Sequence, residues 1–167
     1  GVEKTFGAVR ANHNIDLDIC TGDIHGIIGE NGAGKSTLVS ILYGFYQADA
    51  GSISVFGEEK KLRSTADAIA AVIGMVHQHF MLVPTFTVLE NIILGHEGTD
   101  SLAKGFEAAR VELARLATRY GLDVDLDAVI ENFPVGLQQR VEILKALYRG
   151  ANILILDEPT GVLTPQE

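Results

Sequence analysis

A glycine-rich stretch that runs into a lysine and a serine carries the clearest chemical signal in the sequence. It matches the pattern G-x-x-x-x-G-K-[ST] in full, and its residues are Gly29, Glu30, Asn31, Gly32, Ala33, Gly34, Lys35, Ser36 and, directly after them, Thr37. Glycines let backbone N–H groups turn toward phosphate oxygens because no Cβ stands in the way, and a following helix adds the positive end of its dipole. Lys35 would contact the β- and γ-phosphates of a nucleotide, and the Ser36 hydroxyl would bind Mg²⁺. The stretch therefore predicts a phosphate-binding loop.

Two acids that follow a run of four apolar residues are the second signal. The run Ile153–Leu156 is typical of a central strand covered on both faces, and Asp157 and Glu158 come directly after it. Ligands of open α/β sheets gather at the carboxyl ends of the strands. We therefore expect Asp157 to hold Mg²⁺, directly or through water, and Glu158 to polarise an attacking water as a general base. Alone, the two acids would fit an ordinary surface turn, but beside a phosphate loop they predict nucleotide hydrolysis.

The elements that must position these residues are predicted from hydrophobic spacing. Strands are expected at residues 15–19, 24–28, 52–56, 73–76 and 153–156. Helices are expected at residues 35–43, 66–71, 88–94, 102–120 and 141–148. The phosphate loop thus lies between a strand and a helix, and a helical block precedes the last strand. This order predicts an α/β domain with a helical insert.

The composition fits a single globular domain. The chain has 167 residues, of which 47% are hydrophobic and 21% charged. Its 13 basic and 22 acidic side chains give a net charge of −9, which argues against sequence-independent nucleic-acid binding. The single cysteine, Cys20, cannot form an internal disulfide, and no run of 18 apolar residues is present. We expect no membrane span and no secretion signal, and we interpret a chain that starts at Gly1 without methionine as a fragment.

Together these motifs resemble the ATP-binding-cassette (ABC) ATPases, the nucleotide-binding domains of ABC transporters. The resemblance covers nearly all of the chain. Gln78 stands in the place of the family's Q-loop glutamine, Phe6 in the place of the aromatic residue that stacks on adenine, and residues 158–164 in the place of the D-loop. The resemblance implies an α/β fold: a P-loop NTPase (RecA-like) core with an N-terminal antiparallel β-subdomain and an inserted helical subdomain.

The family's signature motif has its counterpart in the helical part of the chain. Residues 133–140 stand in its place, and those expected to contact nucleotide are Pro134, Val135 and Gly136. On the family pattern, residues 85–145 form the helical subdomain. The ATP-binding core then consists of residues 1–84 and 146–167, and it is incomplete at its C-terminus.

Departures from the family pattern bear on activity. Pro134 stands where the family has a serine, so the hydroxyl is absent, and Leu137 stands where a polar residue is usual. The chain also ends at Glu167, before the position of the family's switch histidine. The chain by itself is therefore expected to be a C-terminally truncated cassette that hydrolyses ATP very slowly or not at all.

The resemblance assigns roles that spacing alone does not. It implies an ATP-hydrolysing subunit with ATP and Mg²⁺ as cofactors, in which Lys35, Gln78 and Glu158 are catalytic. The metal would be bound by Ser36, Gln78 and Asp157. Gln78 would also couple the site to membrane subunits, and the signature motif would contact ATP bound to a partner cassette.

The resemblance is sharpest to the simple-sugar and nucleoside importers of bacteria. Residues 74–84 and 138–147 are the stretches that carry this likeness. In that group two cassettes are usually fused, and this chain resembles the first. The expected partners are a second cassette, transmembrane permease subunits that dock around residues 85–94, and a solute-binding protein. We expect a peripheral subunit at the cytoplasmic face of the cell membrane.

Weaker patterns favour ordinary structure. His77 and His79 are alternate residues that would share one face of a strand, but neither a cysteine nor an acid cluster lies beside them to complete a metal site. Asp123, Asp125 and Asp127 begin like a calcium loop but lack its glycine and its closing glutamate. We expect this acidic run to be a solvated connection between helices.

Three other functions stay open at the level of sequence. A soluble ABC ATPase of DNA repair or translation would carry coiled coils or basic segments, which this sequence lacks. A regulatory domain that binds ATP without hydrolysing it is compatible with Pro134 and with the missing switch histidine. A small-molecule P-loop kinase would not carry a Q-Q-R helix followed by L-D-E-P-T.

Overall fold

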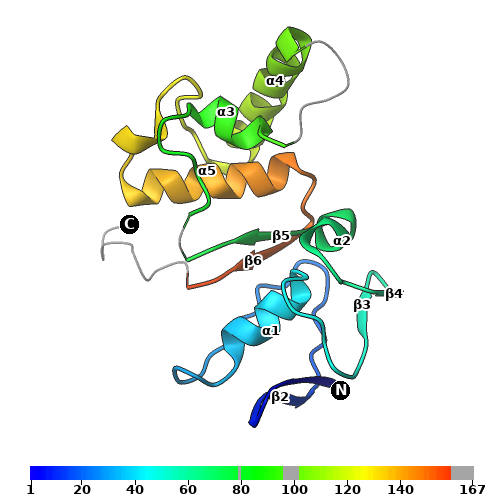
Figure 1. Cartoon of the computed structure of the whole chain (residues 1–167). Helices are drawn as coiled ribbons and strands as arrows, with labels where there is room; N and C mark the ends of the chain where they lie inside the picture. Colours follow the sequence, from blue (N-terminus) through cyan, green and yellow to red (C-terminus); the bar gives the residue numbers. More distant parts are fainter. Residues whose placement is uncertain (79, 96–101, 159–167) are drawn as a thin grey trace. The chain divides into compact units, whose positions relative to one another are not determined.

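The computed structural model describes residues 1–78, 80–95 and 102–158, which form two compact units, Gly1–Ile73 and Gly74–Glu167 (Figure 1). The elements of the first unit are β1 (Val2–Phe6), β2 (Val9–Ile15), α1 (Lys35–Leu42), β3 (Ile53–Val55), β4 (Glu58–Lys60) and α2 (Thr65–Ala70). The elements that follow are β5 (Ile73–Val76), α3 (Val88–Ile93), α4 (Leu102–Tyr120), the 3-10 turn η1 (Ile130–Asn132), α5 (Val135–Tyr148) and β6 (Ile153–Leu156). The sequence predicted a different division, into an ATP-binding core and a helical subdomain with boundaries at residues 84/85 and 145/146. That division stays a prediction.

The strands of the first unit form two antiparallel pairs. β1 pairs with β2 so that Val2 lies opposite Ile15, and β3 pairs with β4 in the same antiparallel sense. Helix α1 buries Leu38 and Ile41 against Val2, and these three residues form a small core. The N-terminal antiparallel part of the predicted fold is therefore confirmed, and its core lies directly beneath the helix that follows the glycine-rich stretch.

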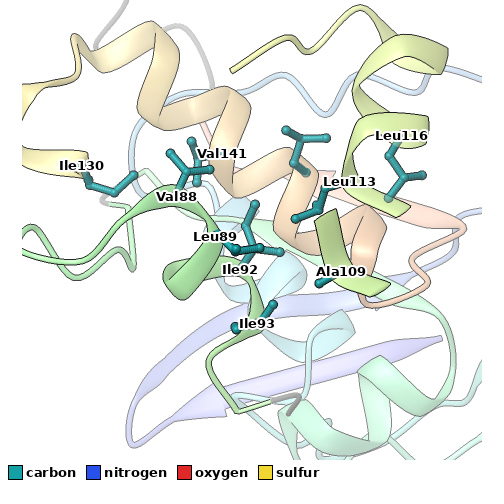
Figure 2. Packing of buried hydrophobic residues seen from close by; sticks show 10 residues of the cluster. Val88, Leu89, Ile92, Ile93, Ala109, Leu113, Leu116, Ile130 and Val141 are labelled. Atoms are coloured by element: carbon teal, nitrogen blue, oxygen red, sulfur yellow. The ribbon is translucent and has the colours of Figure 1, made fainter. Parts of the chain in front are cut away.

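Three helices share one hydrophobic core in the second unit (Figure 2). Helix α3 begins with a capping box, in which Thr87 Oγ1 accepts from the Glu90 N–H and the Glu90 carboxylate accepts from the Thr87 N–H. Buried side chains of α3, α4, η1 and α5 make up the cluster, which comprises Val88, Leu89, Ile92, Ile93, Ala109, Leu113, Leu116, Ile130, Val141 and Leu144. Full burial of one such aliphatic side chain is worth about 1.5–3 kcal/mol, so this cluster is the main stabilising contact of the helices. No helix in the described part of the chain is long and apolar enough to cross a membrane.

Strands β5 and β6 form a two-stranded sheet whose carboxyl ends lie side by side. The N–H of Asp157, just after β6, donates to the carbonyl oxygen of Val76 at 3.0 Å. Gly74 permits the close packing around β5, because a Cβ there would lie 2.8 Å from that of Ala151 and 3.0 Å from that of Ala146. Residues that follow the two strands are thereby brought to one edge.

Most of the predicted elements are confirmed. Strands β5 and β6 have the predicted bounds, and α4 covers the predicted range and ends before Gly121. Helix α5 begins at Val135, after Pro134, rather than at residue 141. The predicted start was too late because the first turns of α5 show no clear apolar periodicity. The mixture of helices and strands confirms the predicted α/β class.

Two predicted strands before the phosphate loop are wrong in the described structure. Strand β2 ends at Ile15, and neither residues 16–20 nor residues 24–28 form a strand. Ile24 and Ile28 are 103% and 96% exposed. Residues of β2, of this stretch and of α1 line an open cavity of about 340 Å³. Hydrophobic spacing predicted strands here, but a strand also needs a hydrogen-bonded neighbour, which spacing cannot supply.

The predicted covering of β6 on both faces is also wrong within the described residues. Ile153 and Ile155 are half-buried, whereas Leu154 and Leu156 are 36% and 42% exposed. A continuous apolar run predicts a strand, but it does not tell whether both faces of the strand are covered by neighbouring elements.

Candidate functional site

The glycine-rich stretch forms a tight loop that leads into α1. The N–H of Ala33 donates to the carbonyl oxygen of Glu30 at 3.2 Å, and Gly34, with a φ of 85°, is the residue before the helix. A Cβ at Gly34 would lie 2.2 Å from the carbonyl oxygen of Ala11, so both the conformation and the space require glycine. No side chain caps the start of α1. The first N–H groups of the helix therefore remain available to an anion such as phosphate.

Lys35 folds back over this loop. Its Nζ donates to the carbonyl oxygens of Gly29 and Glu30 at 2.8 and 2.9 Å. The ammonium is thus held at the loop by two neutral acceptors, which it can exchange for phosphate oxygens. Ser36, which is exposed, and Thr37, which is half-buried, follow on the first turn of α1. The remaining expected loop residues are exposed, namely Asn31, Gly32 and Ala33.

A buried asparagine on β2 supports the loop. Asn12 is only 5% exposed, and its Nδ2 donates to the carbonyl oxygen of Gly34 at 3.1 Å. The same carbonyl accepts the first helical hydrogen bond of α1, from the N–H of Leu38 at 3.0 Å. Motif reasoning did not identify Asn12, because it lies 22 residues before its partner and belongs to no motif. Asn12 also lies outside the strands predicted from hydrophobic spacing, although the structure places it within β2.

Phe6 lies at the end of β1 and presents an exposed ring. It is 42% exposed, and its ring centroid lies 5.1 Å from that of Tyr46, with the two planes at 72°. The Nζ atom of Lys4 lies 5.3 Å from the centroid of the Phe6 ring. A flat aromatic surface that remains accessible can stack on a nucleotide base.

Two predicted catalytic side chains meet at the ends of β5 and β6. Gln78 Nε2 donates to Glu158 Oε2 at 3.0 Å, although the residues lie 80 positions apart in sequence. Glu158 has a φ of 48°, in the left-handed region that side chains other than glycine rarely adopt. Such strain costs on the order of 1–3 kcal/mol and is concentrated at functional sites. The half-buried Asp157 directly precedes Glu158, so an amide and two carboxyl groups share this edge.

The signature stretch lies at the start of α5. Pro134 is the residue before the helix, with φ −63° and ψ 159°, and its carbonyl oxygen accepts from the N–H groups of Leu137 and Gln138 at 3.0 and 3.1 Å. No side chain caps this helix. Val135 is exposed and Gly136 half-buried, so the first turn presents backbone N–H groups and the positive end of a 14-residue helix.

Lys145 of α5 and Arg149, the residue after α5, form hydrogen bonds with the backbone of residues 81–94. Lys145 Nζ donates to the carbonyl oxygen of Met81 at 3.0 Å, and Arg149 Nη2 donates to the carbonyl oxygen of Leu94 at 2.8 Å. Burial lowers the pKa of Lys145 from its ordinary value, although the carboxylate of Glu142 at 3.7 Å partly opposes this shift. The sequence marked α5 only as a helix, because these contacts reach across 55 and 64 positions.

The weaker patterns of the sequence do not form metal sites in the described residues. No group of three or more His, Cys, Asp or Glu side chains is placed there to hold a metal ion. His79 lies outside the described residues, as do residues 159–164 of the expected D-loop. Asp127 pairs with Arg110, whose hydrogen bond lowers the pKa of that carboxyl, and the Asp127 N–H donates to Asp125. The three acids of this run are exposed, as expected for a solvated connection, and Asp127 in addition forms an ion pair.

The residues of the candidate site are divided between the two units. The first unit holds the base-contacting and phosphate-contacting candidates, Phe6 and residues 29–37. The second unit holds the remaining candidates, Gln78, Pro134, Val135, Gly136, Asp157 and Glu158. Each unit thus holds part of the candidate site: the glycine-rich loop with Lys35 lies in the first unit, and the hydrogen-bonded Gln78 and Glu158 lie in the second.

Comparison with known proteins places this chain among transporter proteins. A family model for ABC transporters matches residues 12–161. The chain is 52% identical over 166 residues to the nucleoside import ATP-binding protein NupA of Lactococcus lactis, covering 99% of this chain and 33% of that protein. It is 47% identical over 194 residues to the glucose import ATP-binding protein TsgD13 of Haloferax volcanii, covering 99% of this chain and 35% of that protein.

Among solved structures, CbiO1 of Clostridium perfringens, part of the ABC transporter complex CbiONQ, superimposes with a TM-score of 0.82 at 25% identity, covering 99% of this chain and 66% of that one. The chain spans about a third of the length of the curated relatives it matches. The fold is that of an ABC ATPase cassette, a P-loop NTPase. Because the family model covers most of its residues, the chain belongs to the ABC transporter family.

Proposed function

We propose that this chain is an ATP-binding and ATP-hydrolysing cassette that powers an ABC importer of a nucleoside or a simple sugar. The observation that carries the proposal is the Lys35 ammonium, held over the loop at the uncapped start of α1. A cation beside open backbone N–H groups is a site for a polyphosphate. The names of relatives that import nucleosides or glucose support the cargo class.

ATP would be bound through its phosphates and its base. The N–H groups of residues 32–37 and the Lys35 ammonium would surround the β- and γ-phosphates, and the exposed ring of Phe6 would stack on adenine. Stacking does not depend on hydrogen bonds to the base edge, so it adds affinity for purines without strict base selection.

The residues expected around Mg²⁺ fit a hard cation. Ser36 offers an exposed hydroxyl, Gln78 an exposed amide and Asp157 a half-buried carboxylate, and oxygen atoms are the ligands that Mg²⁺ prefers. When bound, Mg²⁺ would neutralise charge on the phosphate oxygens. The Asp157 N–H bond to Val76 fixes the backbone from which this carboxylate projects.

Hydrolysis would depend on the pair at the ends of β5 and β6. Glu158 would accept a proton from water as the water oxygen forms a bond to the γ-phosphorus and the bond to the ADP oxygen breaks. Gln78 donates its amide to the Glu158 carboxylate at 3.0 Å and so orients it. A Gln side chain that also contacts water would place that water beside the base.

The start of α5 would serve a second nucleotide. Pro134, Val135 and Gly136 would face the γ-phosphate of ATP bound to a partner cassette, fused or separate, as helix N-termini favour anions. Residues 85–94 would face the permease, and a solute-binding protein would deliver the cargo. In this assembly the chain lies at the cytoplasmic face of the membrane without crossing it.

Reconstitution of the full-length protein with its permease in proteoliposomes tests this function. ATP hydrolysis is measured with a purine nucleoside, a pyrimidine nucleoside, ribose and glucose, each with a matching binding protein. We expect one cargo class to stimulate hydrolysis and to accumulate with ATP. Hydrolysis that no cargo stimulates would contradict the importer assignment, and absence of ATP binding would contradict the cassette assignment.

A further inference from the structure

Two side chains, those of Tyr46 and Lys4, contact the Phe6 ring. The first contact is with Tyr46, which lies beyond α1 and meets Phe6 edge to face, with centroids 5.1 Å apart and planes at 72°. Aromatic rings favour this geometry because the positive edge of one ring meets the negative face of the other. Both rings remain open to solvent, Phe6 at 42% and Tyr46 at 44%.

The second contact places a cation against the Phe6 ring. Lys4 Nζ lies 5.3 Å from the ring centroid and donates to Asp49 Oδ1 at 2.7 Å. The other oxygen of Asp49 accepts from the N–H of Thr5 at 2.7 Å, and the Asp49 N–H donates to Glu3. The hydrogen bond from Lys4 lowers the pKa of the Asp49 carboxyl, so the carboxylate stays charged to a lower pH than that of a free aspartate. The Lys4 side chain is only 14% exposed, which limits its freedom to leave the ring.

We propose that Tyr46 and the Lys4–Asp49 ion pair are positioning residues that hold Phe6 as a rigid stacking platform for adenine. This inference rests on the proposed ATP-binding function. A phenyl ring on an exposed hairpin end would otherwise sample several rotamers, and each base-binding event would have to select one. A ring already held by a perpendicular neighbour and a cation loses little further freedom on binding.

Contacts to the base and contacts to phosphate can be separated with ligands that have or lack a base. Loss of Tyr46 should weaken binding of ATP but not of inorganic tripolyphosphate, which has no base. An aromatic pair contributes about 0.5–1.5 kcal/mol, so the expected loss of ATP affinity is about 2- to 12-fold. Loss of the cation–ring contact at an exposed site should weaken ATP affinity about 2- to 5-fold.

Photolabelling of the full-length protein with 8-azido-ATP tests this. The probe attaches through adenine, and the labelled peptide identifies this cassette by mass. The concentrations of ATP and of tripolyphosphate that halve labelling are compared for the native protein, Tyr46→Leu, Tyr46→Phe and Asp49→Asn. Tyr120→Leu is the matched control, because Tyr120 is 48% exposed and also contacts a cation, Arg119, but lies in the second unit.

We expect Tyr46→Leu and Asp49→Asn to raise the concentration of ATP that halves labelling and to leave that of tripolyphosphate unchanged. Tyr46→Phe and Tyr120→Leu should match the native protein in both concentrations. Equal shifts for ATP and tripolyphosphate, or no shift in either variant, would overturn the inference. The phenol-free Tyr46→Phe also guards against a folding defect, because it must restore what Tyr46→Leu loses. Phe6→Ala separates failure of this inference from failure of the proposed function. If Phe6→Ala leaves the concentration of ATP that halves labelling unchanged, adenine does not stack on Phe6 and the inference is wrong. If the native protein is not labelled at all, ATP binding itself is contradicted.

Discussion

Lys35 makes its two present hydrogen bonds with neutral carbonyl oxygens of the loop. Exchange of these acceptors for phosphate oxygens creates charge-assisted hydrogen bonds, each worth about 1.5–3 kcal/mol. Lys35→Ala should therefore weaken ATP affinity about tenfold or more, and should weaken tripolyphosphate to the same extent. Equilibrium binding of both ligands to the full-length protein measures this. Lys61→Ala removes an exposed lysine of the same unit and serves as the control; if both variants bind alike, the loop is not the phosphate site.

Glu158 is the proposed base, and Gln78 fixes its orientation. In Glu158→Gln the amide keeps the shape of the side chain but cannot accept a proton from water. We expect ATP affinity to change little and turnover to fall by about 10²- to 10⁴-fold, the usual contribution of a general base. Steady-state phosphate release and ATP binding measured on one preparation separate the two effects. The exposed Glu131→Gln controls for loss of charge in the same unit, and native turnover in Glu158→Gln would move the base to another residue.

At the scale of residues, motifs predicted most of the candidate site, but not the side chains that support it. Gln78 is predicted by its family position and Glu158 by its place after a strand, and the structure joins them by a hydrogen bond. No motif predicts Asn12 and Tyr46, which contact Gly34 and Phe6, or Lys145, which contacts the segment after Gln78. These contacts each span more than 20 positions, and a single sequence carries no direct signal for them.

At the scale of elements, one buried asparagine joins the segment after β5 to α3. Asn91 is 1% exposed, accepts from the Val83 N–H at 2.7 Å, and donates to the carbonyl oxygens of Val83 and Thr87, both at 3.0 Å. Asn91→Leu keeps the volume but leaves the Val83 N–H without a partner, at a cost of about 1–3 kcal/mol, whereas the two carbonyl oxygens still accept from the N–H groups of Phe86 and Asn91. We expect the unfolding free energy to fall by about 1–3 kcal/mol and amide exchange at Val83 to accelerate.

Hydrogen exchange and urea unfolding of the full-length protein check the Asn91 prediction. Asn152→Leu is the control, because Asn152 is exposed and surface substitutions usually stay within about 0.5 kcal/mol. Unchanged exchange at Val83 would show that the segment keeps its conformation without Asn91.

Elements with their own periodicity were predictable, and elements that depend on a neighbour were not. Helix α4 carries an apolar stripe that identifies it over its whole length, and β5 is an apolar run that is buried throughout. Residues 24–28 carry a similar apolar run, yet they form no strand in the described structure. Sequence spacing records which side chains avoid water, but a β-ladder also requires a second strand within hydrogen-bonding distance.

At the scale of the whole molecule, the chain represents about a third of its relatives' length, and the proposed reaction needs a partner's signature motif. The family could be predicted from the sequence because its motifs and their order along the chain can be recognised in one chain without its partner. The sites of ATP turnover could not be predicted from this sequence alone, because each proposed site would join the phosphate loop of one cassette to the signature helix of the other. Pro134 allows the proposed contact with the partner cassette's ATP to be tested.

Pro134 opens α5 with a φ of −63°, which suits both proline and serine, and makes no side-chain cap. Pro134→Ser should therefore fold and add a hydroxyl that can donate to the γ-phosphate on the partner cassette. Such a hydrogen bond is worth about 1.5–3 kcal/mol, and if it forms mainly in the transition state, turnover at that site should rise about tenfold or more. The site that Pro134 completes would be the slower of two unequal sites.

Single-turnover hydrolysis by the full-length transporter in the Lys35→Ala background favours that site, because limiting ATP then binds mainly at the partner's phosphate loop. Pro84→Ser is the matched control: Pro84 is exposed, and its carbonyl oxygen accepts from the Glu131 N–H, a bond that serine preserves. The hydroxyl oxygen of a serine at position 134 could instead accept a hydrogen bond from a backbone N–H of the first turn of α5, since serine is favoured as a helix cap. Its hydroxyl proton would still be free to donate to phosphate, so capping does not cancel the expected gain. Equal rates with Pro134 and with serine would show that the backbone N–H groups of Val135 and Gly136 already supply the contact, and the two sites would then be equivalent in this respect.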